Sequence, residues 1–223
     1  MQQIAAIFDL DDTLLNESSG RLLFRYLRRS GQFSRYFRLR HSWILAGAFL
    51  NYRIGGRQDM TQLMGRSARI ARGIALDEFW QLTQNWFDEM VVDHISPSGI
   101  AQLAWHRAQG HIPVICSASS QFSVQPVAQH LGIEHRVFTD WLSEDGYLTG
   151  EIRRPIAYGA GKVYWMEQWA ATHNVSLAQS YFYTDHISDL PLLDVVGHPV
   201  AVNPEPQLAQ LATGRGWPIV DWR

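Results

Sequence analysis

Cysteine is almost absent from this sequence: of 223 residues, only Cys116 is a cysteine. A single cysteine excludes an intramolecular disulfide framework and a metal site built from several thiolates. A chain without disulfides suits a reducing compartment, so we expect a cytoplasmic protein. Cys116 lies in an apolar run, where a thiol usually packs inertly, and the sequence indicates no histidine partner to activate it.

Lysine is as scarce as cysteine, since Lys162 is the only lysine and all other basic side chains are arginines and histidines. Neither sign of charge dominates, because 19 Lys and Arg side chains stand against 21 Asp and Glu side chains. The net charge of −2 gives no electrostatic basis for nucleic-acid binding. We therefore expect no nucleic-acid partner.

Long hydrophobic runs are missing as well. The longest uncharged apolar stretch in the first third, residues 42–52, is too short to span a bilayer comfortably. The N-terminus lacks the basic start, apolar stretch and cleavage site of a signal peptide. With 46% hydrophobic residues, the chain still has enough apolar material for a sizeable core. These features predict a soluble protein of one large domain, or of one domain with an insertion.

The sequence does contain a series of short apolar runs, each ending in small or acidic residues. These runs are IAAIFDLD, HIPVICSAS, QSYFYTD, HPVAVN and, near the C-terminus, WPIVDW. Because they do not alternate with polar residues, they predict strands buried on both faces of a parallel sheet. Helical patterns over 97–110, 120–131 and 162–173 lie between them, which is typical of an α/β doubly wound sheet. The Asp145-Gly146 pair within 139–152 predicts a hairpin.

Residues 17–93 break this alternation, because they are helical in pattern and carry few strand signals. They lie between the first and second predicted strands and are far longer than a connection from strand to helix requires. We therefore predict a helical inserted domain over 17–93. The rest of the chain, 1–16 and 94–223, would form a discontinuous core domain.

Polar residues follow three of the predicted strands. They are Asp9, Asp11 and Asp12 after the first strand, Ser117 after the second, and Asp185 and Asp189 after a later one. Ligands of open parallel sheets bind at the carboxyl ends of strands, so these side chains should converge. Converging carboxylates suit a hard divalent cation, and Mg²⁺ is the expected one. The alternative is that each aspartate only caps a helix or a turn.

Taken together, these residues resemble the four motifs of haloacid dehalogenase (HAD) superfamily phosphatases. The matches, in order, are DLDDT at 9–13, Ser117, Lys162 in GAGKV, and DHISD at 185–189. The stretches SASSQFSVQPVAQHLGI and YTDHISDLPLL look most like the branch of subfamily IB that contains phosphoserine phosphatases, and 17–93 resembles its type 1 cap. The resemblance implies a Rossmann-like parallel-sheet core with an all-helical cap. It also implies a Mg²⁺-dependent phosphomonoester hydrolase.

Four catalytic roles follow from this resemblance. Asp9 would be the nucleophile that forms an aspartyl-phosphate, and Asp11 would be the general acid and then the general base. Ser117 would donate a hydrogen bond to a phosphoryl oxygen. Lys162 would stabilise the charge that gathers on the phosphoryl oxygens.

The metal ligands are implied in the same way. Mg²⁺ would bind Asp9, the backbone carbonyl of Asp11, and Asp185. Asp189 would support that end of the site, while Asp12 would face away from it. The metal would stabilise the density of negative charge that the opening motif creates.

The candidate substrate-binding residues are Glu17, Ser18 and His186. Phosphoserine phosphatases typically place a glutamate seven residues beyond the second motif aspartate; here that position is Ser18, and Glu17 precedes it. The departure counts against phosphoserine itself. His186 interrupts the fourth motif and is either a substrate contact or a structural histidine. Relatives in this branch include histidinol-phosphate phosphatases and phosphatases of lipid metabolism, so we expect a small phosphorylated metabolite as substrate.

An arginine-rich stretch over 25–57 is compatible with more than one kind of binding partner. Its arginines include Arg35, Arg38, Arg40, Arg53 and Arg57. They are compatible with a face that docks on anionic lipid, with a funnel for anionic metabolites, or with an ordinary solvated surface. Two alternatives therefore stand beside the metabolite hydrolase: a lipid-phosphate phosphatase in peripheral contact with membranes, and a phosphate-ligand-binding protein without turnover.

Overall fold

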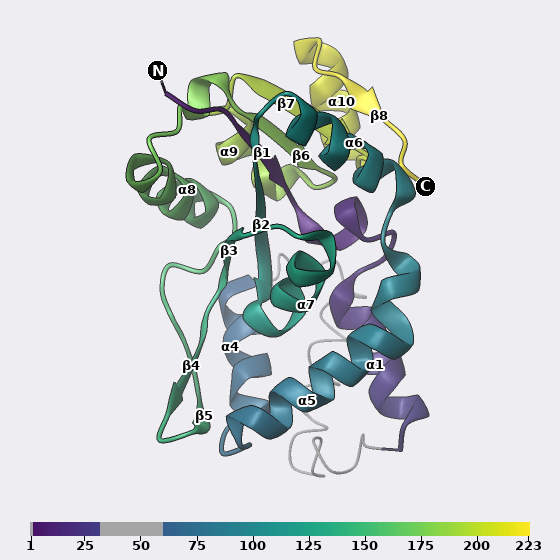
Figure 1. Cartoon of the computed structure of the whole chain (residues 1–223), viewed down its shortest axis with the longest axis vertical. Helices are drawn as coiled ribbons and strands as arrows, with labels where there is room; N and C mark the ends of the chain where they lie inside the picture. Colours follow the sequence, from purple (N-terminus) through teal and green to yellow (C-terminus); the bar gives the residue numbers. More distant parts are fainter. Residues whose placement is uncertain (1, 32–59) are drawn as a thin grey trace.

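The computed structural model describes residues 2–31 and 60–223, which build a central parallel sheet flanked by helices (Figure 1). The sheet has six strands in the order β3-β2-β1-β6-β7-β8. Their bounds are β1 Ala5–Phe8, β2 Ile112–Ser120, β3 His135–Thr139, β6 Tyr181–Thr184, β7 His198–Val202 and β8 Ile219–Val220. Every neighbouring pair in this sheet is parallel. The α/β doubly wound fold predicted from the sequence is confirmed.

The core contains three helices that the sequence pattern predicts, α6 Pro97–Ala108, α7 Gln121–Leu131 and α8 Ala160–Thr172. It also contains two that were not predicted, α9 Leu190–Leu193 and α10 Pro206–Arg215. Ser96 caps α6, since its Oγ accepts a hydrogen bond from the backbone N–H of Gly99 at 3.1 Å. Gly132 ends α7 in the left-handed conformation, with φ of 63°.

Strand β1 shows why its run is apolar without alternation. Ala6 and Phe8 belong to one hydrophobic cluster, and Ala5 and Ile7 belong to another. The first cluster includes residues of α6 and α7, and the second includes residues of α8, α9 and α10. Both faces of β1 are therefore covered, and all four side chains are fully buried.

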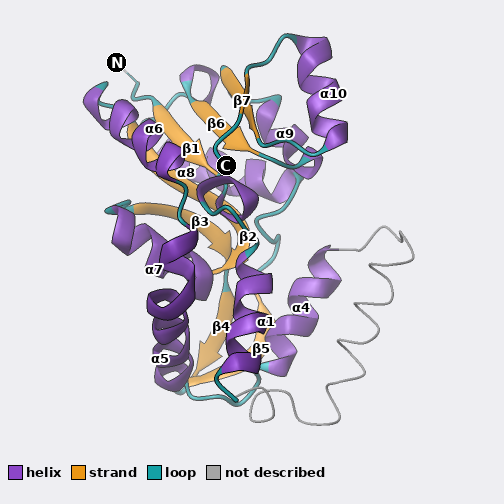
Figure 2. Ribbon diagram, turned by 90° about the vertical axis from the view of Figure 1, so that its right-hand side faces the viewer, coloured by secondary structure: helices purple, strands orange, loops and turns teal. Residues whose placement is uncertain are grey.

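The inserted segment is mainly helical in the part that the structure describes, with a turn and a β-bridge over 71–75. Its helices are α1 Ser19–Arg29, α4 Met60–Ile70 and α5 Leu76–Trp86, followed by short helical turns up to His94. Figure 2 shows them beside the hairpin at one end of the molecule. Within 2–31 and 60–223, no helix is both long and apolar enough to cross a membrane. The apolar stretch 42–52 and the arginines at 35, 38, 40, 53 and 57 lie outside the described residues.

The predicted hairpin consists of β4 Trp141–Glu144 and β5 Tyr147–Ile152, which pair antiparallel. Asp145 and Gly146 form its turn, with φ of 49° and 79°, as a tight hairpin requires. Tyr147 bridges to Ala75, next to α5, and β5 packs against α4. The hairpin thus contacts the inserted helices, although the predicted division of the chain groups it with the core.

Two connections join the inserted helices to the sheet, and they run side by side in opposite directions. Leu15 bridges to Ile95, and the backbone N–H of Asn16 donates to the carbonyl of His94 at 2.8 Å. The backbone N–H of Ser96 donates to the carbonyl of Leu14 at 2.8 Å. The predicted boundaries at 16/17 and 93/94 fall at this crossing point, and the domain division itself stays a prediction.

A buried polar cluster near the start of the sheet was not foreseen from the sequence. His106 is fully buried, and its Nε2 lies 2.8 Å from the hydroxyl of Tyr183, which also accepts a hydrogen bond from Gln102 at 2.9 Å. A neutral His106 satisfies this network when the Tyr183 hydroxyl donates to its Nε2 and its Nδ1–H donates to Nδ1 of His111, 2.8 Å away.

This network predicts a loss of stability in mild acid. Burial, with the charge of His111, lowers the pKa of His106 from its usual 6.5 to about 4. Below pH 6.5 the unfolded chain takes up a proton that the folded chain resists, so stability is full above that pH and falls as the pH drops toward 4. At roughly 1.4 kcal/mol per pKa unit, the loss from His106 should reach about 3 kcal/mol.

Denaturant unfolding between these pH values measures the effect. His106→Gln should flatten the fall in unfolding free energy, whatever it does to stability at neutral pH. An unchanged slope in this variant would assign the acid sensitivity to other groups.

Candidate active site

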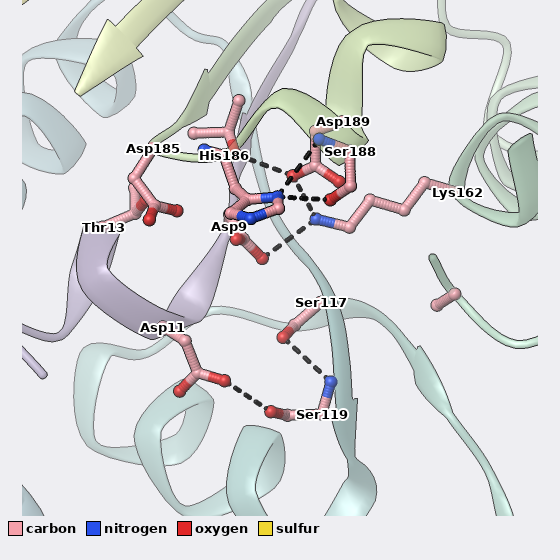
Figure 3. A network of polar contacts seen from close by, with 12 residues as sticks. Asp9, Asp11, Thr13, Ser117, Ser119, Lys162, Asp185, His186, Ser188 and Asp189 are labelled. Atoms are coloured by element: carbon pink, nitrogen blue, oxygen red, sulfur yellow. Dashed lines mark hydrogen bonds and ion pairs between the residues drawn. The ribbon is translucent and has the colours of Figure 1, made fainter. Parts of the chain in front are cut away.

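Three adjacent strands bring the sequence-predicted residues together at one edge of the sheet. Asp9 follows β1, Ser117 lies near the end of β2, and Asp185 follows β6. Because β1 lies between β2 and β6, these residues converge around Asp9, as Figure 3 shows. The backbone N–H of Asp9 donates to the carbonyl of Tyr183 at 2.9 Å, which continues the sheet to the nucleophile position.

Lys162 joins this group from the first turn of α8. Its Nζ lies 3.0 Å from Oδ1 of Asp9 and 2.6 Å from Oδ2 of Asp189. Asp189 also accepts a hydrogen bond from the hydroxyl of Thr184 at 2.7 Å. The side chains of Lys162 and Asp189 are each only 2% exposed, so this is a buried ion-pair network.

The glycine before Lys162 explains how α8 can begin so close to the loop behind it. A Cβ atom at Gly161 would lie 1.9 Å from the carbonyl oxygen of Ile156, which no larger residue can tolerate. The GAGKV segment therefore places the ammonium group in the site because position 161 has no side chain.

Burial and crowding of like charge dominate the electrostatics. Burial raises the pKa of Asp9 to about 7, against the lowering effect of Lys162, with Asp189 and Asp11 adding to the rise. Burial, together with the charges of Asp9 and Asp12, raises the pKa of Asp185 to about 8. Burial alone would lower the pKa of Lys162, but the charges of Asp189 and Asp9 raise it.

This donor set fits a hard divalent cation. Three carboxylates, Asp9, Asp185 and Asp189, share the site with one ammonium group, so the site carries excess negative charge when they are ionised. Among the described residues, no three His, Cys, Asp or Glu side chains are arranged to hold a metal by themselves. The predicted set needs only two, since Mg²⁺ also takes backbone carbonyls and keeps several waters.

Asp11 and Asp12 have separate surroundings. Oδ2 of Asp11 accepts a hydrogen bond from the hydroxyl of Ser119 at 2.7 Å, and Oδ1 accepts one from the backbone N–H of Ser19 at 2.6 Å. Asp12 has a φ of 54° and pairs with Arg21 at 3.2 Å. The turn after β1 therefore commits Asp12 to an exposed ion pair and leaves Asp11 beside β2.

Ser117 is 1% exposed, and its Oγ accepts a hydrogen bond from the backbone N–H of Ser119 at 3.1 Å. Because that bond uses a lone pair, the hydroxyl proton of Ser117 stays available for a phosphoryl oxygen. Cys116, next in the strand, is fully buried, and burial raises the pKa of its thiol. A raised thiol pKa agrees with the sequence-based interpretation of Cys116 as inert packing.

The substrate-binding candidates are not equally placed. Glu17 pairs with Arg25, with Arg21 at 3.5 Å and with His94 at 3.7 Å. Those contacts occupy its carboxylate, so Glu17 could bind a substrate amine only by giving them up. Ser18 is the residue before α1, and its side chain makes no capping hydrogen bond there.

His186 begins the turn that contains Asp189. Its Nδ1 accepts a hydrogen bond from the backbone N–H of Ser188 at 3.1 Å, and its Nε2 lies 3.4 Å from Glu205. Glu205 also accepts from the backbone N–H of Ile187 at 3.0 Å. These contacts favour the structural role for His186, although its side chain is 45% exposed.

Sequence reasoning missed several residues that hold this site in shape. Thr13, whose hydroxyl lies 3.5 Å from Asp185, belongs to the DLDDT motif and could have been found there. Thr184 lies directly before Asp185, and its hydroxyl donates to Asp189 at 2.7 Å. Ser119 and Glu205 carried no signal of their own, because a serine at a strand end and a glutamate before a helix are common.

Comparison with known proteins finds relatives that match nearly the whole of this chain. Residues 6–194 match the family of haloacid dehalogenase-like hydrolases. A Mycobacterium tuberculosis protein named "probable phosphatase" is 30% identical over 219 residues, covering 98% of this chain and 75% of that protein. A histidinol-phosphatase from Neisseria meningitidis is 29% identical, covering 98% of both chains.

A solved structure has the same fold as this chain over the full length of both proteins. A protein of unknown function from Bordetella pertussis superposes with a TM-score of 0.89 at 27% identity, over the full length of both chains. The family match covers most of the chain, and it includes the two aspartate-bearing strand ends and Lys162. The chain therefore belongs to the haloacid dehalogenase-like hydrolase family.

Proposed function

We propose that this protein is a Mg²⁺-dependent phosphomonoester hydrolase that works in the cytoplasm through an aspartyl-phosphate intermediate. Its substrate would be a small phosphorylated metabolite of the phosphoserine or histidinol-phosphate type. The observation that carries the proposal is the buried Lys162, whose Nζ contacts both Asp9 and Asp189 at the carboxyl end of the sheet. A buried cation beside a carboxylate suits the charge of a transferring phosphoryl group.

In the first half of the reaction, a carboxylate oxygen of Asp9 attacks phosphorus and the bond to the leaving oxygen breaks. Oδ1 of Asp9 is held by Lys162, which leaves Oδ2 for the attack. Asp11 gives its proton to the leaving alcohol. Lys162 and the hydroxyl of Ser117 stabilise the negative charge on the phosphoryl oxygens.

In the second half, a water molecule attacks the phosphorus of the aspartyl-phosphate. Asp11, now ionised, takes the proton of that water, and the bond to Asp9 breaks to release phosphate. Mg²⁺, held by Asp9, Asp185 and the carbonyl of Asp11, would neutralise charge on the phosphoryl group. The predicted cap would exclude bulk water between the two halves.

The substrate class rests on the relatives and on one residue. The Neisseria meningitidis relative, named a histidinol-phosphatase, matches this chain from end to end. Ser18 stands where phosphoserine phosphatases typically have an amine-binding glutamate, and Glu17 is engaged with arginines. We therefore rank a histidinol-phosphate-like amino-alcohol phosphate above phosphoserine.

A phosphate-release screen over amino-alcohol, sugar, nucleotide and lipid phosphates tests the proposal, with Asp9→Asn as the blank. We expect the highest kcat/KM among the amino-alcohol phosphates. A lipid phosphate as the best substrate would favour the membrane-docking alternative. Binding of phosphate esters without release of phosphate would favour the protein without turnover.

Metal removal should silence the enzyme. EDTA is expected to abolish phosphate release and added Mg²⁺ to restore it, while Asp185→Ala should raise the Mg²⁺ concentration for half-maximal activity by about tenfold or more.

Protons compete with the metal because the pKa values of Asp9 and Asp185 are raised to about 7 and about 8. At limiting Mg²⁺, activity should therefore fall as the pH drops from about 8 to about 6, and saturating Mg²⁺ should reduce that fall. Full hydrolysis in metal-free buffer would contradict this part of the mechanism.

A further inference from the structure

A pair of serines encloses the carboxyl group of Asp11. Ser119 lies near the end of β2, and Ser19 is the first residue of α1. The hydroxyl of Ser119 donates to Oδ2 of Asp11 at 2.7 Å, while the backbone N–H of Ser19 donates to Oδ1 at 2.6 Å. The two serine hydroxyls lie 3.1 Å apart. Oδ2 of Asp11 is thus held from the sheet by Ser119, as Figure 3 shows, and Oδ1 is held from the inserted helix by Ser19.

We propose that Ser119 is a positioning residue for proton transfer: its hydroxyl fixes the carboxyl group of Asp11 in the orientation that faces the leaving oxygen of the substrate. The inference rests on the function proposed above, in which Asp11 is the general acid and base. Ser119 itself touches no reacting atom in this scheme. It acts through Asp11.

The backbone around Asp11 shows why an outside group is needed. Asp11 has an extended φ and ψ, −69° and 134°, and the next residue, Asp12, has a φ of 54°. No regular helix therefore sets the direction of the Asp11 side chain. Lys162 contacts Asp9 and Asp189, so it does not restrain Asp11. A misplacement of a catalytic group by about 1 Å can slow a reaction about 100-fold, so a hydrogen bond that holds Asp11 in place can raise the rate substantially.

The chemistry of serine suits a partner of an acid that becomes a base. A hydroxyl both donates and accepts, whereas a lysine or arginine only donates. Beside ionised Asp11, Ser119 donates to Oδ2. Beside protonated Asp11, the Ser119 hydroxyl can turn to the oxygen of Ser19, 3.1 Å away, and so leave the proton of the carboxylic acid free for the leaving oxygen. Ser119 keeps its own proton throughout, and the proton that reaches the leaving oxygen comes from Asp11.

The experiment compares two esters that differ in their need for an acid. Phenyl phosphate and p-nitrophenyl phosphate share a ring, but phenolate is the stronger base and gains more from protonation as it leaves. The first-turnover release of each phenol, at saturating Mg²⁺, reports the acid step before the aspartyl-phosphate is hydrolysed.

Ser119→Ala should slow the first-turnover release of phenol about tenfold and leave that of p-nitrophenol within about twofold, because general acid catalysis contributes far more to the poorer leaving group. The effect should appear in kcat rather than in KM. Ser119→Thr keeps the hydroxyl and should restore most of the phenol rate. Ser120→Ala is the matched control, because the Ser120 hydroxyl has no hydrogen-bond partner among the described residues, and it should behave as wild type with both esters.

Two results would overturn the inference: equal slowing of both esters by Ser119→Ala, which marks a structural role, or no slowing of either. If the alanine variant does not fold, Ser119→Thr and Ser119→Val make the same comparison, since they differ only in a hydroxyl and a methyl group. Asp11→Asn separates this inference from the proposed function. If Asp11→Asn distinguishes the two esters and Ser119→Ala does not, only the role of Ser119 is wrong. If Asp11→Asn fails to distinguish them, the role of Asp11 is wrong, and the inference falls with it.

Discussion

Asp9→Asn should reduce phosphate release by about 10⁴-fold or more, because loss of a nucleophile removes the covalent route altogether. An amide nitrogen or oxygen does not attack phosphorus as a carboxylate does, and the variant also loses one of the predicted Mg²⁺ ligands. The fold should survive, since asparagine has nearly the same shape and no charge to bury. Burial raises the pKa of Asp9, so the folded state already disfavours its ionised form.

Asp12→Asn is the matched control for this variant. Asp12 lies three residues beyond Asp9 in the same turn, but it pairs with Arg21, whose side chain is 58% exposed. Loss of an exposed ion pair costs little, so most of the activity should be kept. Steady-state kinetics compare the activities of the two variants, and thermal unfolding in metal-free buffer shows whether each one is folded. Equal and severe losses from both substitutions would show that the wrong carboxylate carries the reaction.

The sheet could be predicted from the sequence because burial on both faces leaves a plain signal. The run from Ala5 to Phe8 is apolar at every position, and the structure covers both of its faces. The hairpin was equally clear, since only residues that accept positive φ suit its turn at Asp145 and Gly146. Such local requirements act on a few neighbouring residues, which is why a single sequence reveals them.

The arrangement within the site needed the structure. Strand order puts β1 between β2 and β6, and this long-range pairing is what brings Ser117 and Asp185 to Asp9. The sequence carried no sign that Lys162 would contact Asp189 as well as Asp9, 27 and 153 residues away. Ser119 shows the same difficulty, because its partner Asp11 is 108 residues distant.

Glu17 illustrates a different difficulty, because its position in the sequence supports two interpretations. It was a candidate for binding a substrate amine because of its distance from the DLDDT motif. The structure instead pairs it with Arg21 and Arg25, four and eight residues further on, where α1 presents the same face. That helical spacing was present in the sequence, and it competes directly with the functional interpretation.

Lys162→Met should be the most destabilising single change in the site and should also remove most of the activity. Methionine replaces the aliphatic stem of the lysine side chain but leaves Asp9 and Asp189 buried without their cation. Removing one partner of a buried ion pair typically costs about 3–5 kcal/mol of unfolding free energy, and losing one stabilising donor costs about 10²–10³-fold in kcat. Arg153→Met provides the contrast, because its ion pair with Asp140 is exposed and should be worth less than about 1 kcal/mol.

The pH dependence of this loss gives the sharper test. Burial raises the pKa of Asp9 and Lys162 opposes that rise, so without the ammonium group Asp9 should bind its proton still more tightly in the folded chain than in the unfolded one. A folded pKa that is raised contributes stability at low pH, which is lost as the pH increases. The destabilisation by Lys162→Met should therefore be larger near pH 8 than near pH 5, in metal-free buffer, and Lys162→Met combined with Asp189→Asn should recover part of it. A loss that does not change with pH, or a double variant no more stable than the single one, would mean that Lys162 stabilises the site by packing rather than by charge.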